Sequence, residues 1–444
     1  MMFFKRRFWV LIHRYAGLYM AVFLIVAGLT GTILAYDKEI NQWLIPEMTS
    51  VPVQNRPMLD EFTLREKALA LAPNSQISFM ELNHAPGEVV SFLLQPKVNS
   101  ATGKPYDLGC AMIYLNPYTG EETARLKSFD DWPVNRRNFI FFVFDLHSTL
   151  HLGQTGGLLF GIAALIWTID CFVGFALTLP RPLPSAERGA GRQAPPRSSW
   201  LGRWVPSWKF VWKGKAFRIN FSLHRAAGLW TWAMLFVFAI SSVSFNLPQV
   251  YEPAMKRVFS VRDVWAGIPD LREPAPAPGL DWRQAAEIGQ KLAAQQASLH
   301  GFKLRKSYGT TYFSYDPGKG VFSYAAHGER DVGYHTPAVT VYFDGKTGEL
   351  RGSSFASGEN AASTFTNWMA AIHGRTVGGW VMQFVVGVMG VVIAMLSVTG
   401  VYIWWVKRKA AVSLSRAGRR RTGAVIDSSP GSAQFAASCP KARP

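Results

Sequence analysis

Residues 9–18 read WVLIHRYAGL and residues 220–229 read NFSLHRAAGL, so the chain contains two copies of one short pattern. Both copies place His-Arg-x-x-Gly-Leu at the start of a long apolar run, with His13 leading the first run and His224 leading the second. The offset between the copies is constant across the pattern. We therefore interpret the chain as a tandem duplication, and the fold has to accommodate two similar halves.

A second repeated pattern supports the duplication. Residues 151–157 read HLGQTGG and residues 373–379 read HGRTVGG, and each stretch precedes another apolar run. Four hydrophobic helices are thus predicted, each with one histidine near an end.

The apolar runs are long enough to cross a membrane. The chain has 444 residues, of which 49% are hydrophobic, and the apolar residues are clumped rather than spread. A helix needs about 20 largely uncharged residues to span a bilayer core. Four windows meet that length: 8–36, 157–180, 221–247 and 380–406. The first is too long for a secretory signal and lacks a small-residue cleavage site before Asp37, so we expect it to remain as an anchor.

Basic residues flank one end of the predicted bundle. They precede the first helix, fill the loop after the second and follow the fourth, so the positive-inside rule makes both termini cytoplasmic. A net charge of +18 can indicate nucleic-acid binding, but here topology and anionic lipid account for the excess, and we expect no nucleic-acid partner. Cys110, Cys171 and Cys439 form neither a disulfide framework nor a metal-thiolate cluster.

The segments between the helices repeat a mixed α+β plan. Within residues 42–136 we expect a helix at 58–72, strands at 77–83 and 88–95, and a turn where residues 116–121 read NPYTGE. Within residues 250–366 a helix follows the N-cap residue Asp281, and a similar turn returns where residues 344–349 read DGKTGE.

Each half is therefore expected to comprise a membrane helix, an outer α+β domain and a second membrane helix. Two halves of equal orientation would place their pseudo-two-fold axis along the membrane normal. The predicted boundaries are a first span at 8–36, an outer domain at 37–136, a second span with an outer extension at 137–180, a basic cytoplasmic loop at 181–218, a third span at 219–247, an outer domain at 248–366, a fourth span at 367–408 and a disordered tail at 409–444.

The repeated histidines are the candidate functional residues. A single histidine at a membrane interface often serves only as an amphipathic residue, but ionisable residues at membrane depth are functional candidates. Symmetry would bring His13 to His224 near the inner boundary and His151 to His373 near the outer boundary. The result would be two bis-imidazole sites, one in each leaflet.

Haem iron suits two imidazoles better than zinc does. Zinc sites use four protein ligands, or three and a water, and only Asp145 accompanies either pair within two turns. Haem iron needs one or two axial ligands, and a bundle core accommodates a flat apolar porphyrin. We therefore predict two haem groups, with axial ligands His13, His224, His151 and His373.

Small residues follow the first two histidines. Gly17 and Gly228 lie one turn deeper than His13 and His224 on the same helix face, where a missing side chain leaves room for a porphyrin plane. Gly28 and Gly31, deeper in the first helix, fit either this interpretation or close packing of membrane helices.

Further hypotheses concern the polar and charged residues near the histidines. Arg14 and Arg225 could bind haem propionates or lipid phosphates at the inner boundary, and Arg375 with Gln154 could bind propionates at the outer boundary. Asp170, inside the second predicted span, could carry protons, bind a quinone or hydrogen-bond within its own helix.

His147 is an alternative to His151 as the outer ligand, because it lies four residues earlier on the same predicted helix. The repeated pattern favours His151. The remaining histidines lie in the outer domains, where we expect ordinary solvated residues: His84, His300, His327 and His335. The sequence contains no Gly-rich phosphate loop and no nucleotide-binding domain, so electrons would have to come from a separate donor.

In this order of motifs, the chain resembles the PepSY-associated transmembrane family over residues 8–408. The resemblance rests on the His-Arg-x-x-Gly-Leu entries at His13 and His224, the stretches at His151 and His373, and the two Thr-Gly-Glu turns. Within the family it is similar to iron-regulated ferric-siderophore reductases of the bacterial inner membrane. That resemblance implies PepSY-like periplasmic domains, two haem b groups, and electron transfer to a periplasmic Fe(III)–siderophore, with release of Fe(II).

Three functions remain open at this point. The first is a di-haem oxidoreductase supplied by a cytoplasmic reductase or a quinol. The second is a membrane-anchored module that binds peptides or inhibits a protease without redox activity, in which the histidines would be dispensable. The third is a siderophore or haem transporter, which would need a polar cavity at mid-membrane. For the first, a substrate position between the two outer domains is expected, near aromatic residues that include Tyr308, Tyr312 and Tyr334.

Overall fold

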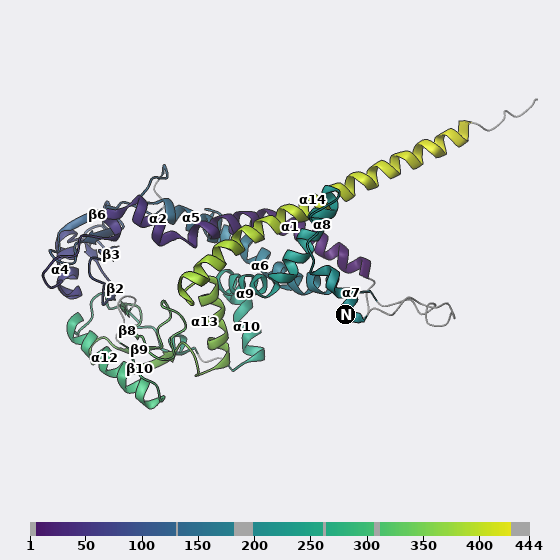
Figure 1. Cartoon of the computed structure of the whole chain (residues 1–444). Coiled ribbons are helices and arrows are strands. Elements are labelled where there is room, and N and C mark those ends of the chain that lie inside the picture. The colour runs from purple at the N-terminus through teal and green to yellow at the C-terminus, as the bar shows by residue number, and fades with distance from the viewer. Residues whose placement is uncertain (1–5, 130–131, 182–198, 261–262, 306–310, 428–444) are drawn as a thin grey trace, which may run out of the picture.

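The computed structural model describes residues 6–129, 132–181, 199–260, 263–305 and 311–427. Long helices form a bundle, and all the strands lie together at one end of it (Figure 1). The N-terminus and the far end of the last helix lie away from the strands. Part of the predicted basic loop, residues 182–198, and the end of the predicted tail, residues 428–444, lie outside the described residues.

Three described helices are long and apolar enough to cross a membrane. They are α1 (Arg6–Leu34), α6 (Gly153–Thr178) and the part Gly379–Ser413 of α14 (Gly379–Asp427). A fourth span is possible by length and composition if α8 (Ala216–Trp230) and α9 (Trp232–Asn246) count as one broken span. The helix α14 also continues through residues 409–427, part of the segment for which disorder was predicted.

The break between α8 and α9 differs from the continuous third helix that the sequence predicted. The two helices are bent by 71° at Thr231. The indole of Trp230 donates a hydrogen bond to the carbonyl of Trp208, whereas the indole of Trp232 donates one to the carbonyl of Cys171 on α6. The residues on either side of the bend are thus held to two different segments.

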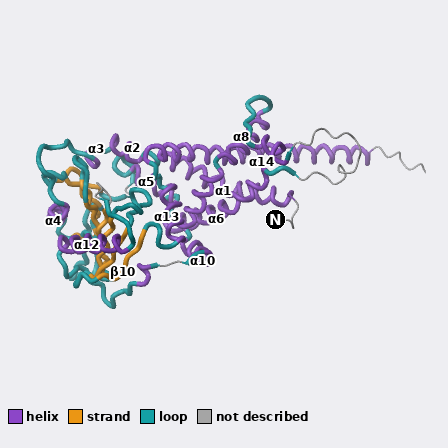
Figure 2. The backbone as a smooth tube through the Cα atoms, turned by 60° about the horizontal axis from the view of Figure 1, so that its bottom comes forward, coloured by secondary structure: helices purple, strands orange, loops and turns teal. Residues whose placement is uncertain are grey.

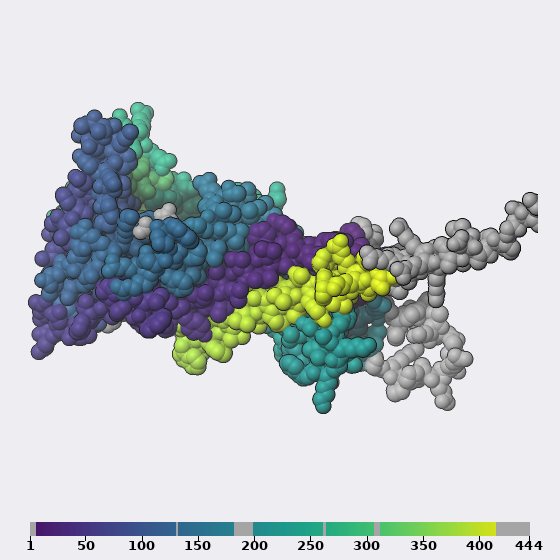
Figure 3. Space-filling view, turned by 90° about the horizontal axis from the view of Figure 1, so that it is seen from above, coloured from purple at the N-terminus to yellow at the C-terminus, as the bar shows by residue number. Residues whose placement is uncertain are grey.

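The helices pack as α1 against α14 and α6 against α9. Figure 3 shows α1 in purple and α14 in yellow-green running side by side. The contact is close because a Cβ added to Gly28 would lie 2.5 Å from the carbonyl oxygen of Gly390, and Thr32 donates a hydrogen bond to the carbonyl of Gly387. Gly28 therefore serves close helix packing, one of the two roles that its position allowed.

Shorter helices surround the bundle and the strands (Figure 2). Two of them precede membrane helices at the strand-bearing end: α5 (Phe139–Thr149) before α6, and α13 (Ala361–His373) before α14. The others are α2 (Asp37–Leu44), α3 (Pro46–Thr49), α4 (Glu61–Leu71), α7 (Trp200–Trp204), η2 (Val205–Ser207), α10 (Pro248–Val258), α11 (Val264–Gly267) and α12 (Trp282–Leu299). As predicted, Asp281 caps α12, and Asp60 caps α4 in the same way.

Within the described residues, the strands form three antiparallel sheets. The largest has the order β10-β9-β8-β7-β2, the second β3-β5-β6, and the third β1-β4. The strands are β1 (Ser75–Gln76), β2 (Phe79–Leu82), β3 (Val90–Leu93), β4 (Gln95–Pro96), β5 (Met112–Leu115), β6 (Glu122–Leu126), β7 (Thr311–Asp316), β8 (Val321–Ala326), β9 (Val339–Asp344) and β10 (Leu350–Phe355).

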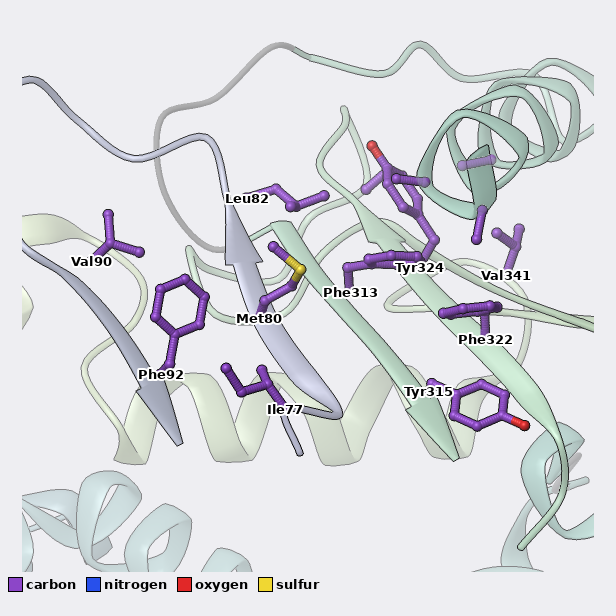
Figure 4. Packing of buried hydrophobic residues seen from close by; sticks show 14 of the residues in the cluster. Ile77, Met80, Leu82, Val90, Phe92, Phe313, Tyr315, Phe322, Tyr324 and Val341 are labelled. Atoms are coloured by element: carbon purple, nitrogen blue, oxygen red, sulfur yellow. The ribbon is translucent and has the colours of Figure 1, made fainter. Parts of the chain in front are cut away.

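The two outer segments share one sheet, whereas the sequence predicted a separate domain in each half. Strand β2 of the first segment pairs with β7 of the second, with Met80 opposite Phe313. Both of these side chains are fully buried, and they belong to one core cluster to which both segments contribute (Figure 4). Pairing covers an edge strand that would otherwise expose unpaired backbone groups. The sequence predicted a strand at 77–83, but a single strand does not specify its partner.

The two predicted turns have closely similar hydrogen bonds. In the first, the amide of Gly120 donates to the carbonyl of Asn116, and in the second the amide of Gly348 donates to the carbonyl of Asp344. Both glycines have a positive φ, of 69° and 75°, which a residue with a side chain rarely adopts. The turns therefore confirm the local structure that the NPYTGE and DGKTGE stretches predicted.

Candidate functional site

His13 and His224 face one another near the end of the bundle that lies away from the strands. His13 belongs to α1 and His224 to α8, and their ring centres are 6.2 Å apart, with the ring planes at 64°. Both rings are partly buried. The structure thus brings together the first pair of histidines that the repeat predicted.

At the strand-bearing end, His373 of α13 faces His147 of α5 rather than His151. The ring centres of His147 and His373 are 6.3 Å apart, and their planes are nearly perpendicular, at 88°. His151 is exposed instead, and its Nδ1 lies 2.6 Å from a carboxylate oxygen of Asp145. The predicted pairing of His151 with His373 is therefore wrong, and the alternative residue, His147, is the partner of His373.

The spacing to a different glycine explains the correction. His147 precedes Gly153 by six residues, and His373 precedes Gly379 by the same six residues. Gly153 and Gly379 begin α6 and α14, with similar φ angles of 54° and 56°. The repeated pattern instead matches the doublet Gly156-Gly157 to Gly378-Gly379. This displaces the equivalent histidine of the first half by four residues, about one helical turn. Aligning the helix starts would have selected His147.

The separation within each pair suits one metal ion between two imidazoles. A metal–imidazole bond is about 2 Å long, and a ring nitrogen lies about 1.1 Å from its ring centre, so two rings on opposite sides of one metal have centres about 6.2 Å apart. The two observed separations are 6.2 and 6.3 Å. In the described part of the chain, no group of three or more His, Cys, Asp or Glu residues could hold a metal ion, so each site offers imidazoles alone.

Hydroxyl groups hold the two outer rings in a defined tautomer. Nδ1 of His147 lies 3.0 Å from Oγ1 of Thr30, and Nδ1 of His373 lies 2.6 Å from Oγ of Ser241. Both hydroxyls also lie within donating distance of the carbonyl four residues earlier in their own helix, so accepting a bond from the histidine Nδ1–H satisfies both groups. A neutral ring that is protonated at Nδ1 keeps a free lone pair on Nε2, the form that binds metals.

The inner rings are held in the same way but by different acceptors. Nδ1 of His13 lies 2.9 and 3.0 Å from the two carboxylate oxygens of Asp170. Nδ1 of His224 lies 3.0 Å from the carbonyl oxygen of Leu396 and 3.1 Å from Oγ1 of Thr399. The hydrogen bonds described here are therefore made at Nδ1 in each of the four rings. Each pair therefore presents two uncommitted Nε2 atoms.

The inner pair opens onto a cavity of about 540 Å³ between α1, α6, α8 and α14. This volume falls within the range of small-molecule and cofactor sites, roughly 300–1,000 Å³. Gly17 and Gly228 both line it, and a Cβ added to Gly17 would meet no atom within 4 Å. Gly174 and Gly400 lie against the inner rings, because a Cβ on either would lie 3.3 Å from Cε1 of His13 or of His224. The glycines thus leave space where the sequence predicted it.

The predicted basic residues have different surroundings. Arg14 and Arg225 line the inner cavity, and Arg225 also donates to the carbonyl of Pro206 at 2.7 Å. At the outer end, Arg375 donates hydrogen bonds to the carbonyl of Leu34, to Asp37 and to the hydroxyl of Tyr334. Arg375 therefore ties the connection between α13 and α14 to the end of α1 and to the outer segment. Gln154 is exposed.

Of the four histidines in the strand-bearing segments, which the sequence predicted to be solvated, two are buried. His327 is buried and lies 2.9 Å from Asp331, and His84 is buried beside Glu61. His300 and His335 are exposed. Burial, together with the charge of Glu81, raises the pKa of Tyr312 to about 12, so its hydroxyl stays protonated beside Nδ1 of His335.

Tyr308, one of the aromatic residues expected near a substrate, lies outside the described residues.

A comparison with curated proteins found no significant match to the chain. A scan against protein-family models matched one described as PepSY-associated TM region, over residues 10–407. This match includes both histidine pairs, both outer segments and the candidate membrane spans except residues 6–9 and 408–413. The chain therefore belongs to the PepSY-associated transmembrane family.

Proposed function

We propose that the protein is a transmembrane oxidoreductase that holds two haem b groups and passes electrons to an Fe(III)–siderophore on the strand-bearing side. The observation that carries this proposal is the presence of two histidine pairs with ring centres 6.2 and 6.3 Å apart. Both separations suit bis-imidazole ligation of one iron. One pair near each end of the bundle suits electron transfer across a membrane better than a single site would.

The residues present fit haem: each position has a pair of imidazoles, and the inner pair also opens onto a cavity. His13 and His224 would hold one haem and His147 and His373 the other, while their Nδ1 partners fix the ring orientation. Bound haem would supply one-electron exchange between Fe(III) and Fe(II) at each pair. Gly17 and Gly228 leave the apolar space that a flat ring requires, and Arg14 and Arg225 are placed to pair with carboxylates at the cavity wall. Haem propionates and lipid phosphates are both anions of the right kind for these arginines.

We further infer that the chain is a tandem duplication whose halves meet at the two sites. One offset of 211 residues relates His13 to His224 and also relates the ring-holding Thr30 to Ser241. A second offset of 226 relates His147 to His373 and also the ring-supporting Gly174 to Gly400. Each pair therefore takes one histidine from each half, as a pseudo-two-fold axis along the membrane normal would require.

The orientation follows from charge and from the shape of the molecule. The basic residues at the start of α1 and after the apolar part of α14 lie at the end away from the strands (Figure 1). Under the positive-inside rule this end, with both termini, is cytoplasmic, and the sheets are periplasmic in a bacterial inner membrane. His13 and His224 then form the inner site, and His147 and His373 the outer site.

The proposed reaction is a one-electron reduction of the chelated metal. Siderophores bind Fe(III), a hard acid, far more tightly than Fe(II), so reduction releases the iron. A cytoplasmic flavoprotein or a membrane quinol would be the donor. Each donor molecule gives up two electrons and reduces two ferric ions, and a quinol would release two protons on becoming a quinone.

The test is reoxidation of the reduced protein by its proposed substrate. The purified full-length chain in detergent would be reduced with dithionite, freed of excess reductant and mixed anaerobically with a ferric hydroxamate. We expect the reduced haem absorbance to disappear and one Fe(II) to be trapped by a ferrous chelator per electron lost. The gallium(III) complex of the same hydroxamate, which cannot be reduced under these conditions, is the matched control and should cause no reoxidation. A haem-loaded protein that stays reduced in the presence of several ferric hydroxamates and catecholates would contradict the substrate assignment.

A further inference from the structure

Asp170 is a buried carboxylate in the middle of an apolar helix. It lies on α6 and is 7% exposed, and both of its oxygens are within 3.0 Å of Nδ1 of His13. Burying a carboxylate costs free energy unless a partner compensates for the lost water. The ring of His13 is that partner, so the hydrogen bond within α6 that the sequence allowed is not needed to explain Asp170.

The carboxylate makes His13 unlike the other three histidines. Nδ1 of His224 faces a carbonyl and a hydroxyl, and Nδ1 of His147 and of His373 each face a hydroxyl. The helix position that corresponds to Asp170 in the second half, 226 residues later, is Leu396, whose backbone carbonyl receives the bond instead. Only the inner pair therefore has a charged acceptor behind one ring.

A charged acceptor changes the electronic character of the ring. Hydrogen bonds to an ionised acceptor are about twice as strong as bonds to a neutral one. A carboxylate that draws the Nδ1 proton toward itself makes Nε2 a stronger electron donor, and a stronger donor favours the oxidised form of a bound metal. Carbonyl and hydroxyl acceptors produce the same effect more weakly.

We propose that Asp170 is a positioning and tuning residue that holds the reduction potential of the inner site below that of the outer site. This inference rests on the proposed function, because it concerns the potential of a haem held by His13 and His224. Electrons that enter on the cytoplasmic side would then move to the outer site with a favourable free-energy change. Asp170, which has no carboxylate counterpart in the second half, would thus set the direction of electron flow.

The experiment is a potentiometric titration followed by absorbance. The His147→Ala variant is expected to keep the inner haem alone, so it reports the inner potential without overlap. Its single midpoint should coincide with the lower of the two midpoints of the unmodified chain. Adding Asp170→Asn should raise that midpoint by about 59 mV or more, which corresponds to a change of tenfold or more in the one-electron equilibrium constant. Asp170→Glu should restore a low value.

The control variant is Thr399→Val, which removes one neutral acceptor from His224 and leaves the Leu396 carbonyl in place. It should move the inner midpoint much less than Asp170→Asn does. The inference is overturned if the midpoint left in His147→Ala is the higher of the two, a result that does not depend on any Asp170 variant. It is also overturned if Asp170→Asn keeps its haem but shifts the midpoint no more than Thr399→Val. A preparation that never contains haem would instead overturn the proposed function, and this inference with it.

Discussion

Substitutions of His147 and His151 separate the structure's pairing from the one that the repeated sequence pattern favoured. His147→Ala removes one of the two imidazoles of the outer pair, together with a hydrogen bond to Thr30 worth about 1 kcal/mol. Alanine is well tolerated at the end of α5, so the fold should survive. We expect the haem content to fall from two to one per chain.

The matched control is His151→Asn. His151 has a positive φ of 56°, a conformation that asparagine adopts more readily than alanine. Its contact with Asp145 is solvent-exposed, with 42% and 39% of the two side chains accessible, so losing it should cost at most about 1 kcal/mol. This variant should keep two haems per chain.

The assay is haem content from the pyridine haemochrome spectrum, normalised to protein and measured on the monodisperse peak of a gel-filtration run. The reverse outcome, in which His151→Asn loses one haem and His147→Ala keeps two, would refute the pairing in the structure. Loss of one haem in both variants would show that the outer site needs a contact between the two residues that the structure does not contain.

Three further substitutions test other parts of the account. Gly17→Leu places a side chain in the open space of the inner cavity, so it should lower the occupancy of the inner haem while gel filtration still shows a folded protein. Phe313→Ala empties a fully buried position in the sheet that both outer segments share, so it should destabilise the protein by about 3–5 kcal/mol, measured as earlier thermal unfolding and faster proteolysis of the outer segments. Partial burial opposes ionisation of Asp344, but hydrogen bonds and the charge of Arg351 lower its pKa from 3.8 to about 2. This carboxylate therefore stabilises the fold above pH 3.8 and loses that effect as the pH falls toward 2. Asp344→Asn should reduce the drop in melting temperature between pH 5 and pH 2.5, and an unchanged drop would contradict this role.

The sequence predicted the features that depend on local pattern. The apolar runs, the N-cap at Asp281, the two Thr-Gly-Glu turns and the pairing of His13 with His224 all follow from periodicity, capping chemistry and a repeated motif. Each of these is fixed by residues close together in the chain or by one constant offset.

The features that depend on contacts between distant segments were not predicted. The bend at Thr231 lies between two indoles that bond to different segments, and the shared sheet depends on the pairing of β2 with β7. Nothing in a single strand specifies that neighbour. The selection of His151 over His147 came from aligning two glycine doublets, although the matching glycines are those that begin α6 and α14. The role of Asp170 also required the fold, because its partner lies 157 residues away.

The most direct test of two haem-holding histidine pairs is the visible spectrum of the purified, unmodified protein, oxidised and then reduced with dithionite. The account predicts a b-type spectrum with two haems per chain, and both irons six-coordinate and low-spin because two imidazoles bind each. A folded, monodisperse preparation that is colourless, and that takes up no haem when haemin is added, would contradict it and leave only a membrane anchor that carries the shared outer sheet.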